Sequence, residues 1–127
     1  MTRIICAEDC GNAPKRQLIK QLLTALARGE NTFFLNNLSD DIVWQRVGRT
    51  PLQGKPAVST ELQRMKREIK SEMIIENIVT HGAAGAANGR MKLKNGKSFG
   101  FAHVYRFQGA AGVRIKEITE YLIRTGD

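Results

Sequence analysis

The spacing of the apolar residues changes once along this chain, and the change restricts the fold more than any other feature of the sequence. Before Ser71 helical spacing dominates, as in the stripe formed by Leu18, Leu22 and Leu26. After Ser71 apolar residues alternate with polar or small ones, which is typical of strands buried on one face. Helices that precede a run of strands predict an α+β fold and exclude a parallel sheet built from alternating strands and helices.

Three helices and one strand are expected in the first part of the chain. The first helix begins near Asn12, which can cap it, and it ends at Gly29. The other expected elements are a short helix around 33–38, a strand at 41–47, a loop at 48–56 and a helix from Pro56 to Ile69.

An antiparallel meander is expected in the second part, and its central strand carries an unusual stripe. The predicted strands occupy residues 72–82, 83–94, 98–107 and 113–124. The strand at 98–107 alternates strictly, and one face carries Phe99, Phe101, His103, Tyr105 and Phe107. Its other face is small and flat, with Ser98, Gly100, Ala102 and Val104. A histidine within an aromatic stripe is either a core residue or a functional group in a pocket.

The turn at 95–96 is Asn-Gly, a strong hairpin signal because both residues tolerate the positive φ of a tight turn. A two-residue turn places Asn88 and Arg90 on the face of the aromatic stripe. A shift by one residue places Met91 and Leu93 there instead, because side chains alternate between the faces of a strand. The sequence leaves both registers open.

The composition fits one domain over residues 1–127, with residues 1–11 as a short N-terminal extension. No apolar run approaches the roughly 20 residues that cross a bilayer, and the N-terminus lacks the pattern of a signal peptide. We therefore expect a cytoplasmic protein. In that compartment Cys6 and Cys10 are interpreted as an incidental pair, and we expect no metal site.

The net charge is +8, so a polyanionic partner has to be considered. The basic residues gather at 64–70 and at 90–97. No nucleic-acid-binding motif accompanies them, and we interpret both clusters as solvated faces. Nucleic acid is therefore the least supported partner.

Two segments resemble the nuclear transport factor 2-like superfamily, in particular its SnoaL-like and ketosteroid isomerase-like branches. They are LSDDIVWQRVGRTPLQGKPAV (38–58) and HVYRFQGAAGVRIKEITEYL (103–122), and the similarity covers about residues 13–124. The resemblance implies a single SnoaL-like domain, in which a cone-shaped, curved antiparallel sheet wraps around three N-terminal helices. It further implies an apolar cavity open at one end, no cofactor, and a homodimer formed through the outer sheet face.

The catalytic groups of the ketosteroid isomerases are not present at the matching positions. The general base falls at or beside Arg46, which cannot accept a proton near neutral pH. The oxyanion-hole acid falls at His103, and the tyrosine falls near Leu22. We therefore reject the isomerase mechanism of that branch. The two carboxylates bridged by an arginine, which limonene epoxide hydrolases need, are not evident either.

The resemblance instead implies a different polar set in the cavity. The candidate catalytic residues are His103, Arg46 and Glu120. The candidate ligand-binding residues are Trp44, Asn88, Arg90, Phe99, Phe101, Tyr105, Ile118 and Leu22. An apolar, positively lined cavity suits a small apolar or anionic organic ligand.

Two functions follow from this set. The first is a cofactor-independent isomerase, cyclase or lyase that acts by proton transfer. The second is a non-catalytic ligand-binding or protein-interaction module, in which an Arg46–Glu120 pair only satisfies two buried charges and His103 belongs to the core. The superfamily fold hosts both classes, so the fold does not decide between them.

Overall fold

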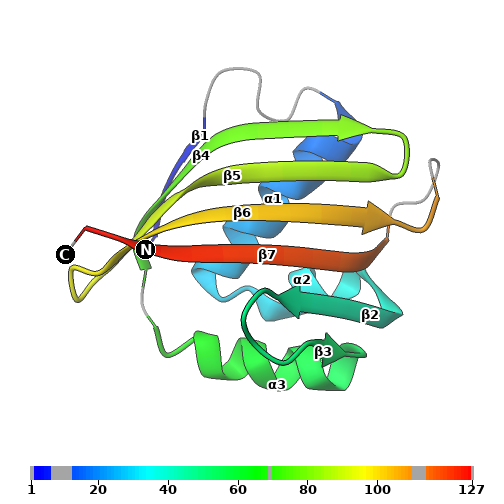
Figure 1. Cartoon of the computed structure of the whole chain (residues 1–127), viewed down its shortest axis with the longest axis horizontal. Helices are drawn as coiled ribbons and strands as arrows, with labels where there is room; N and C mark the ends of the chain where they lie inside the picture. The colour runs from blue at the N-terminus through cyan, green and yellow to red at the C-terminus, as the bar shows by residue number, and fades with distance from the viewer. Residues whose placement is uncertain (1, 7–12, 69, 110–113, 127) are drawn as a thin grey trace.

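The computed structural model describes residues 2–6, 13–68, 70–109 and 114–126. Its elements are β1 (Arg3–Cys6), α1 (Pro14–Arg28), α2 (Asn31–Asn36), β2 (Leu38–Arg46), β3 (Leu52–Gln53), α3 (Lys55–Met65), β4 (Lys70–His81), β5 (Ala84–Leu93), β6 (Ser98–Phe107) and β7 (Ile115–Thr125). They form the predicted α+β fold (Figure 1). None of the helices in the described ranges has the length and apolar character needed for a bilayer crossing.

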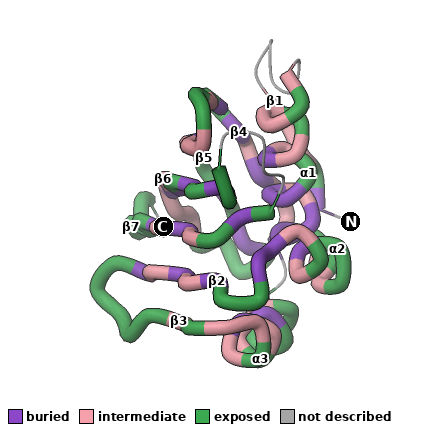
Figure 2. The backbone as a smooth tube through the Cα atoms, turned by 90° about the vertical axis from the view of Figure 1, so that its right-hand side faces the viewer, coloured by how far each residue is buried: buried purple, intermediate pink, exposed green. Residues whose placement is uncertain are grey.

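The seven strands form one curved, open sheet in the order β1-β4-β5-β6-β7-β2-β3. The helix α1 packs on β4 and β5, and α3 packs on β2 and β3. Figure 1 shows the opposite face of β4 to β7 uncovered, and Figure 2 shows buried residues on the strands and on the helices that face them.

The sheet is mixed, whereas the sequence predicts an antiparallel one. The pairs within β4 to β7 are antiparallel, but β1 pairs in parallel with β4, and β2 pairs in parallel with β7. The parallel pairs arise where strands from the N-terminal half join the two edges of the C-terminal meander.

The helix α1 shows how local sequence sets the boundaries of an element. It begins with Pro14 in the first turn, where a missing N–H is tolerated, and Gly29 ends it with a φ of 74°. Its N-cap is Ala13, and Asn12, the predicted cap, lies outside the described residues. The apolar stripe of the helix is buried, and Leu22 at its centre is 1% exposed.

Three features of the N-terminal half of the chain differ from the expectation. The strand β1 lies in the N-terminal segment, and β3 lies in the loop at 48–56; both are too short to show a period in the sequence. Cys6, at the end of β1, is disulfide-bonded, so its interpretation as an incidental thiol is wrong. Cys10 lies outside the described residues.

The hairpin between β5 and β6 is closed by Leu93 and Lys97, which enclose a loop of three residues, 94–96. The N–H of Leu93 donates to the carbonyl oxygen of Lys97 at 2.8 Å, and the N–H of Gly96 donates to the carbonyl oxygen of Leu93 at 3.0 Å. Gly96 has a φ of 92°, as the last position of a three-residue hairpin loop requires.

This loop selects the register that turns Met91 inward, so the placement of Asn88 and Arg90 in the interior is wrong. Met91 is 9% exposed and pairs with Phe99, on the face of the aromatic stripe. Asn88 lies on the outer face, where its Oδ1 accepts a hydrogen bond from Asn77 Nδ2 at 2.9 Å. On the same face the guanidinium of Arg90 lies 3.9 Å from a carboxylate of β4.

Candidate functional site

The histidine of the aromatic stripe takes part in a buried network of three side chains. Its Nδ1 lies 2.8 Å from the hydroxyl of Tyr105, and its Nε2 lies 3.0 Å from Oε2 of Glu120. Tyr105 is two residues further along the same face of β6, and Glu120 is directly opposite His103 on β7. His103 is 3% exposed, Tyr105 1% and Glu120 8%. The network therefore lies inside the fold.

The protonation of Tyr105 and Glu120 follows from their surroundings. Burial, with the negative charge of Glu120, raises the pKa of Tyr105 well above its usual range, so the hydroxyl stays protonated and can donate to Nδ1 of His103. Burial also acts to raise the pKa of Glu120, but the hydrogen bond from His103 and the charges of Arg46 and Arg49 outweigh it and lower this pKa. An ionised Glu120 accepts the Nε2–H of His103, and every group in the network has a partner.

A second polar cluster lies beside this network, on β2 and α3. Arg46 Nη1 donates to Oε2 of Glu61 at 2.9 Å, and Nη2 donates to the carbonyl oxygen of Thr50 at 3.1 Å. Arg64 donates to both oxygens of Glu61, at 3.0 and 2.6 Å. The hydrogen bond from Arg64, against the effect of burial, lowers the pKa of Glu61. Glu61, rather than Glu120, is therefore the carboxylate paired with Arg46.

Glu61 is absent from the predicted site, although it is central to this cluster. The apolar residues Val58 and Leu62 predict its helix, and this pattern places a glutamate between them on the solvent-exposed side. The one signal available was the spacing of three residues between Glu61 and Arg64, which favours an ion pair on a helix surface.

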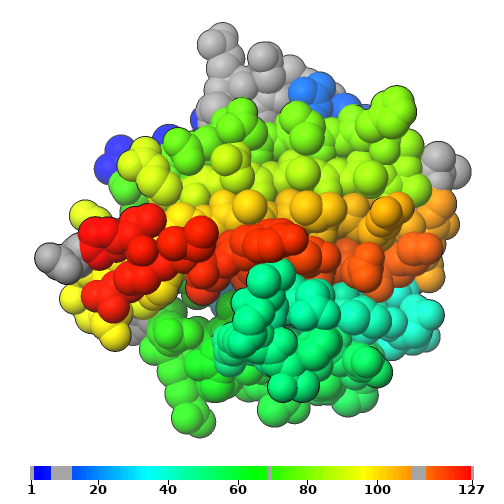
Figure 3. Space-filling view, viewed as in Figure 1, coloured from blue at the N-terminus to red at the C-terminus, as the bar shows by residue number. Residues whose placement is uncertain are grey.

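Both clusters border a pocket of about 280 Å³ between α3 and the inner face of β5 to β7. The space-filling view shows an opening in the surface between β7 and the region of α3 and β4 (Figure 3). The apolar part of the wall includes Leu26, Met65, Met91, Leu93, Phe99 and Leu122. The charged part consists of Arg46, Arg49, Arg64 and Lys70, with Glu61, Glu68 and Glu120.

The predicted site residues fall into three groups. Those on the pocket wall are Arg46, Glu120 and Phe99. Those in the interior are His103, Tyr105, Phe101, Trp44, Ile118 and Leu22, each 4% exposed or less. Asn88 and Arg90, on the outer face, are separated from the pocket by the sheet. Glu120 is thus the member of the buried network that reaches the pocket.

Three buried polar groups of β2 lack a hydrogen-bond partner among the described residues, namely Oγ of Ser39, Nε1 of Trp44 and Nε of Arg46. A buried donor without a partner costs about 1–3 kcal/mol. All three atoms are inaccessible to solvent, although Arg46 as a residue borders the pocket. Within the described ranges, no three or more His, Cys, Asp or Glu side chains are grouped closely enough to hold a metal ion.

No protein-family model matches this sequence, and no curated protein matches it significantly. Solved structures of similar fold do match. A putative SnoaL-like polyketide cyclase from Shewanella denitrificans has a TM-score of 0.72 at 16% identity, over 87% of this chain and 91% of that one. An LEH-like epoxide hydrolase from M. tuberculosis has a TM-score of 0.70 at 24% identity, over 84% of this chain and 80% of that one. A nuclear transport factor 2-like protein of unknown function from Burkholderia pseudomallei has a TM-score of 0.71 at 17% identity, over 86% of this chain and 90% of that one. At these identities the likeness is one of fold.

Proposed function

We propose that this chain, which has the nuclear transport factor 2-like fold, binds a small organic ligand beside Glu120 and transfers a proton without a cofactor. The observation that carries the proposal is the position of the Glu120 carboxylate, which borders the pocket and is held by His103 at 3.0 Å. The cyclase and the epoxide hydrolase of similar fold support a small-molecule reaction as the class. They do not specify the reaction, because one fold hosts many.

The wall of the pocket favours a ligand that carries an oxygen acceptor on an apolar body. Met91, Leu93 and Phe99 provide an apolar surface, and four cationic side chains face three carboxylates. A carbonyl or carboxylate oxygen suits the cationic side chains, and the rest of the ligand packs on the apolar wall. Ketones and keto acids have this combination of groups.

Glu120 borders the pocket, where it can accept a proton from the carbon next to a carbonyl group of the ligand. The pKa of Glu120 is lowered, so its carboxylate is ionised at neutral pH. As the proton leaves carbon, negative charge develops on the carbonyl oxygen, where Arg46 can stabilise it. Transfer of the proton from Glu120 to a different carbon then gives an isomer. His103 and Tyr105 are positioning residues in this scheme, because they hold the carboxylate and lie behind it.

Deuterium uptake tests this proposal. A panel of cyclic ketones is incubated in D₂O with wild type, with Glu120→Gln, and with Glu117→Gln as a matched control on the outer face of β7. Wild type and Glu117→Gln should both speed exchange at the α carbon of at least one ketone. Glu120→Gln should lose about a hundredfold of that rate, which is typical for removal of a general base. Equal rates in Glu120→Gln and wild type would contradict the proposal, and ketone binding without exchange would favour the non-catalytic module.

We also propose that the partner of this chain is a second copy, bound through the outer sheet face. Four large apolar side chains are exposed there, with Val79 at 62%, Val104 at 42%, Tyr121 at 47% and Ile123 at 67%. Tyr121 pairs in the sheet with the small residue Ala102, and Ile123 pairs with Gly100. Such a patch can cover itself in a two-fold dimer, because the same surface of each copy faces the other.

A further inference from the structure

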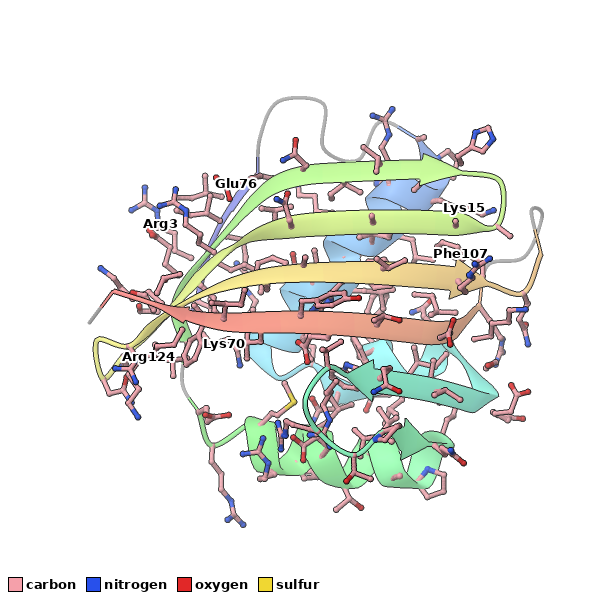
Figure 4. All side chains as sticks on the ribbon, in the orientation of Figure 1. Arg3, Lys15, Lys70, Glu76, Phe107 and Arg124 are labelled. Atoms are coloured by element: carbon pink, nitrogen blue, oxygen red, sulfur yellow. The ribbon has the colours of Figure 1, made fainter. Side chains whose placement is uncertain are left out.

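One lysine lies inside the fold, at the start of β4. Lys70 is 7% exposed, so the interpretation of the whole basic cluster at 64–70 as a solvated face is wrong for this residue. Its main-chain oxygen accepts a hydrogen bond from the hydroxyl of Thr2 at 2.8 Å, which anchors the backbone here. Figure 4 shows Lys70 near the end of the sheet, on the side of β7 that faces α3.

A β-bulge turns the side chain of Lys70 inward. Lys70 pairs with Leu93, but the next pair is Glu72 with Lys92, so the register shifts between them. Lys70 and Met73 are both buried, although residues three apart in a regular strand face opposite sides. Bulges near functional sites often redirect a side chain in this way. Without the bulge, Lys70 would point to the outer face.

The ammonium group of Lys70 forms neither a hydrogen bond nor an ion pair within the part of the chain that the structure describes. The carboxylates whose charges act on it are bound elsewhere: Glu68 lies 3.7 Å from Arg64, and Glu120 lies 3.0 Å from His103. Burial lowers the pKa of Lys70, and Arg64 adds to this effect, whereas the charges of Glu68 and Glu120 oppose it. Lys70 is therefore neutral more often than an exposed lysine, and a neutral amine is a nucleophile.

Lys70 also lies where two pockets meet. The first is the pocket that Glu120 borders. The second, of about 490 Å³, lies between the end of α1 and the start of β4, and Lys66 and Lys94 line it as well. Lys70 borders both. A small molecule bound in either pocket would therefore lie beside Lys70.

We propose that Lys70 forms an imine with an aldehyde or ketone bound in the pocket. The inference rests on the proposed function and narrows its ligand to a carbonyl compound that reacts covalently. It is carried by three observations: the bulge that turns the side chain inward, the lack of a partner for its ammonium group, and its place on the same pocket wall as Glu120.

The step balances without a further reactant. The neutral Nζ adds to the carbonyl carbon, and a C–N bond forms while one proton of Nζ passes to the carbonyl oxygen. The hydroxyl group of the resulting carbinolamine takes up a proton from solvent, and its C–O bond breaks to release one water molecule, which leaves an iminium ion on Nζ. Glu120 can then accept a proton from the adjacent carbon of the iminium ion and give an enamine, which is the same transfer that the proposed function assigns to it.

Reductive trapping tests this inference on the intact chain. The protein is incubated at neutral pH with benzaldehyde and sodium cyanoborohydride, which reduces an imine to a stable benzyl-amine, and the labelled lysine is identified by peptide mass spectrometry. Lys70 should be labelled before Lys66 and Lys94, which line the second pocket. Lys70→Met should lose the label, whereas Lys66→Met, the matched control, should keep it. Circular dichroism shows whether each variant is folded. If Lys70→Met does not fold, the position of the label in wild type decides whether Lys70 is the reactive lysine.

The outcomes also separate this inference from the proposed function. Glu120→Gln should keep the label on Lys70 and lose deuterium exchange, because imine formation does not need the carboxylate. Equal labelling of all lysines would overturn the inference. So would deuterium exchange that persists in Lys70→Met, and that result would leave the proposed function intact, with Lys70 only a cationic part of the wall.

Discussion

Replacement of Glu120 by Gln tests the buried network through its effect on stability. The side chain keeps its shape, and its amide oxygen can still accept from Nε2 of His103, but the charge is lost. A hydrogen bond to a charged group contributes about 1.5–3 kcal/mol and a neutral one about 0.5–1.5. Since the Glu120 side chain is 10% exposed, solvent screens it little, and we expect Glu120→Gln to lower the free energy of unfolding by about 1–2 kcal/mol at pH 7.

The effect should depend on pH in one direction. The folded-state pKa of Glu120 is lowered from 4.5, so the stabilisation is present above that pH and is lost as the pH falls through the folded-state pKa. Urea unfolding of wild type and Glu120→Gln at pH 7 and at lower pH gives the difference at each pH. The difference should shrink in acid, and Glu117→Gln, on the outer face, should change little at any pH. A difference that is constant with pH, or a variant more stable than wild type at pH 7, would refute the charge-assisted bond.

Two further predictions concern the sheet. A Cβ on Gly89 would collide with the main-chain oxygen of Ile74, whereas one on Gly100 would meet only Thr125 Cγ2 at 3.7 Å. Gly89→Ala should therefore lower the free energy of unfolding by about 1–3 kcal/mol, whereas Gly100→Ala should leave it nearly unchanged. Equal urea midpoints for the two variants would show that the strands do not pack closely at Gly89. For the dimer, sedimentation should give twice the 14.2 kDa mass of the chain, and Ala102→Arg should give the monomer; a monomeric wild type would remove the proposed interface.

The order of the elements could be predicted because each long element repeats its own period. The change from helical spacing to alternation near Ser71 correctly separated the helices from the meander. The stripe on β6 was equally clear, and Phe101, His103, Tyr105 and Phe107 are all buried. Periodicity identifies which face of an element is buried, and these features depend on nothing else.

The register of the β5–β6 hairpin could not be predicted, because Asn95-Gly96 fits loops of two or three residues. The chain uses three, and the difference of one residue moves Asn88 and Arg90 to the outer face. Such a choice depends on which side chains the interior accepts, here Met91 and Leu93.

Two site residues were missed for reasons of tertiary structure. Glu61 becomes part of the pocket because α3 packs against β2, and that contact brings it within 2.9 Å of Arg46. Lys70 is turned inward by a bulge that leaves no mark on the periodicity of its neighbours. In both cases a charged residue near the edge of an apolar stripe is read as solvated until its surroundings are known.

The rate of α-deuteration of a ketone by wild type, divided by the rate for Glu120→Gln at the same protein concentration, tests the central claim most directly. The claim is that the carboxylate held by His103 accepts a proton from a ligand in the adjoining pocket. The account predicts a ratio on the order of one hundred. A ratio of one, with both proteins folded and the ketone bound, would contradict it.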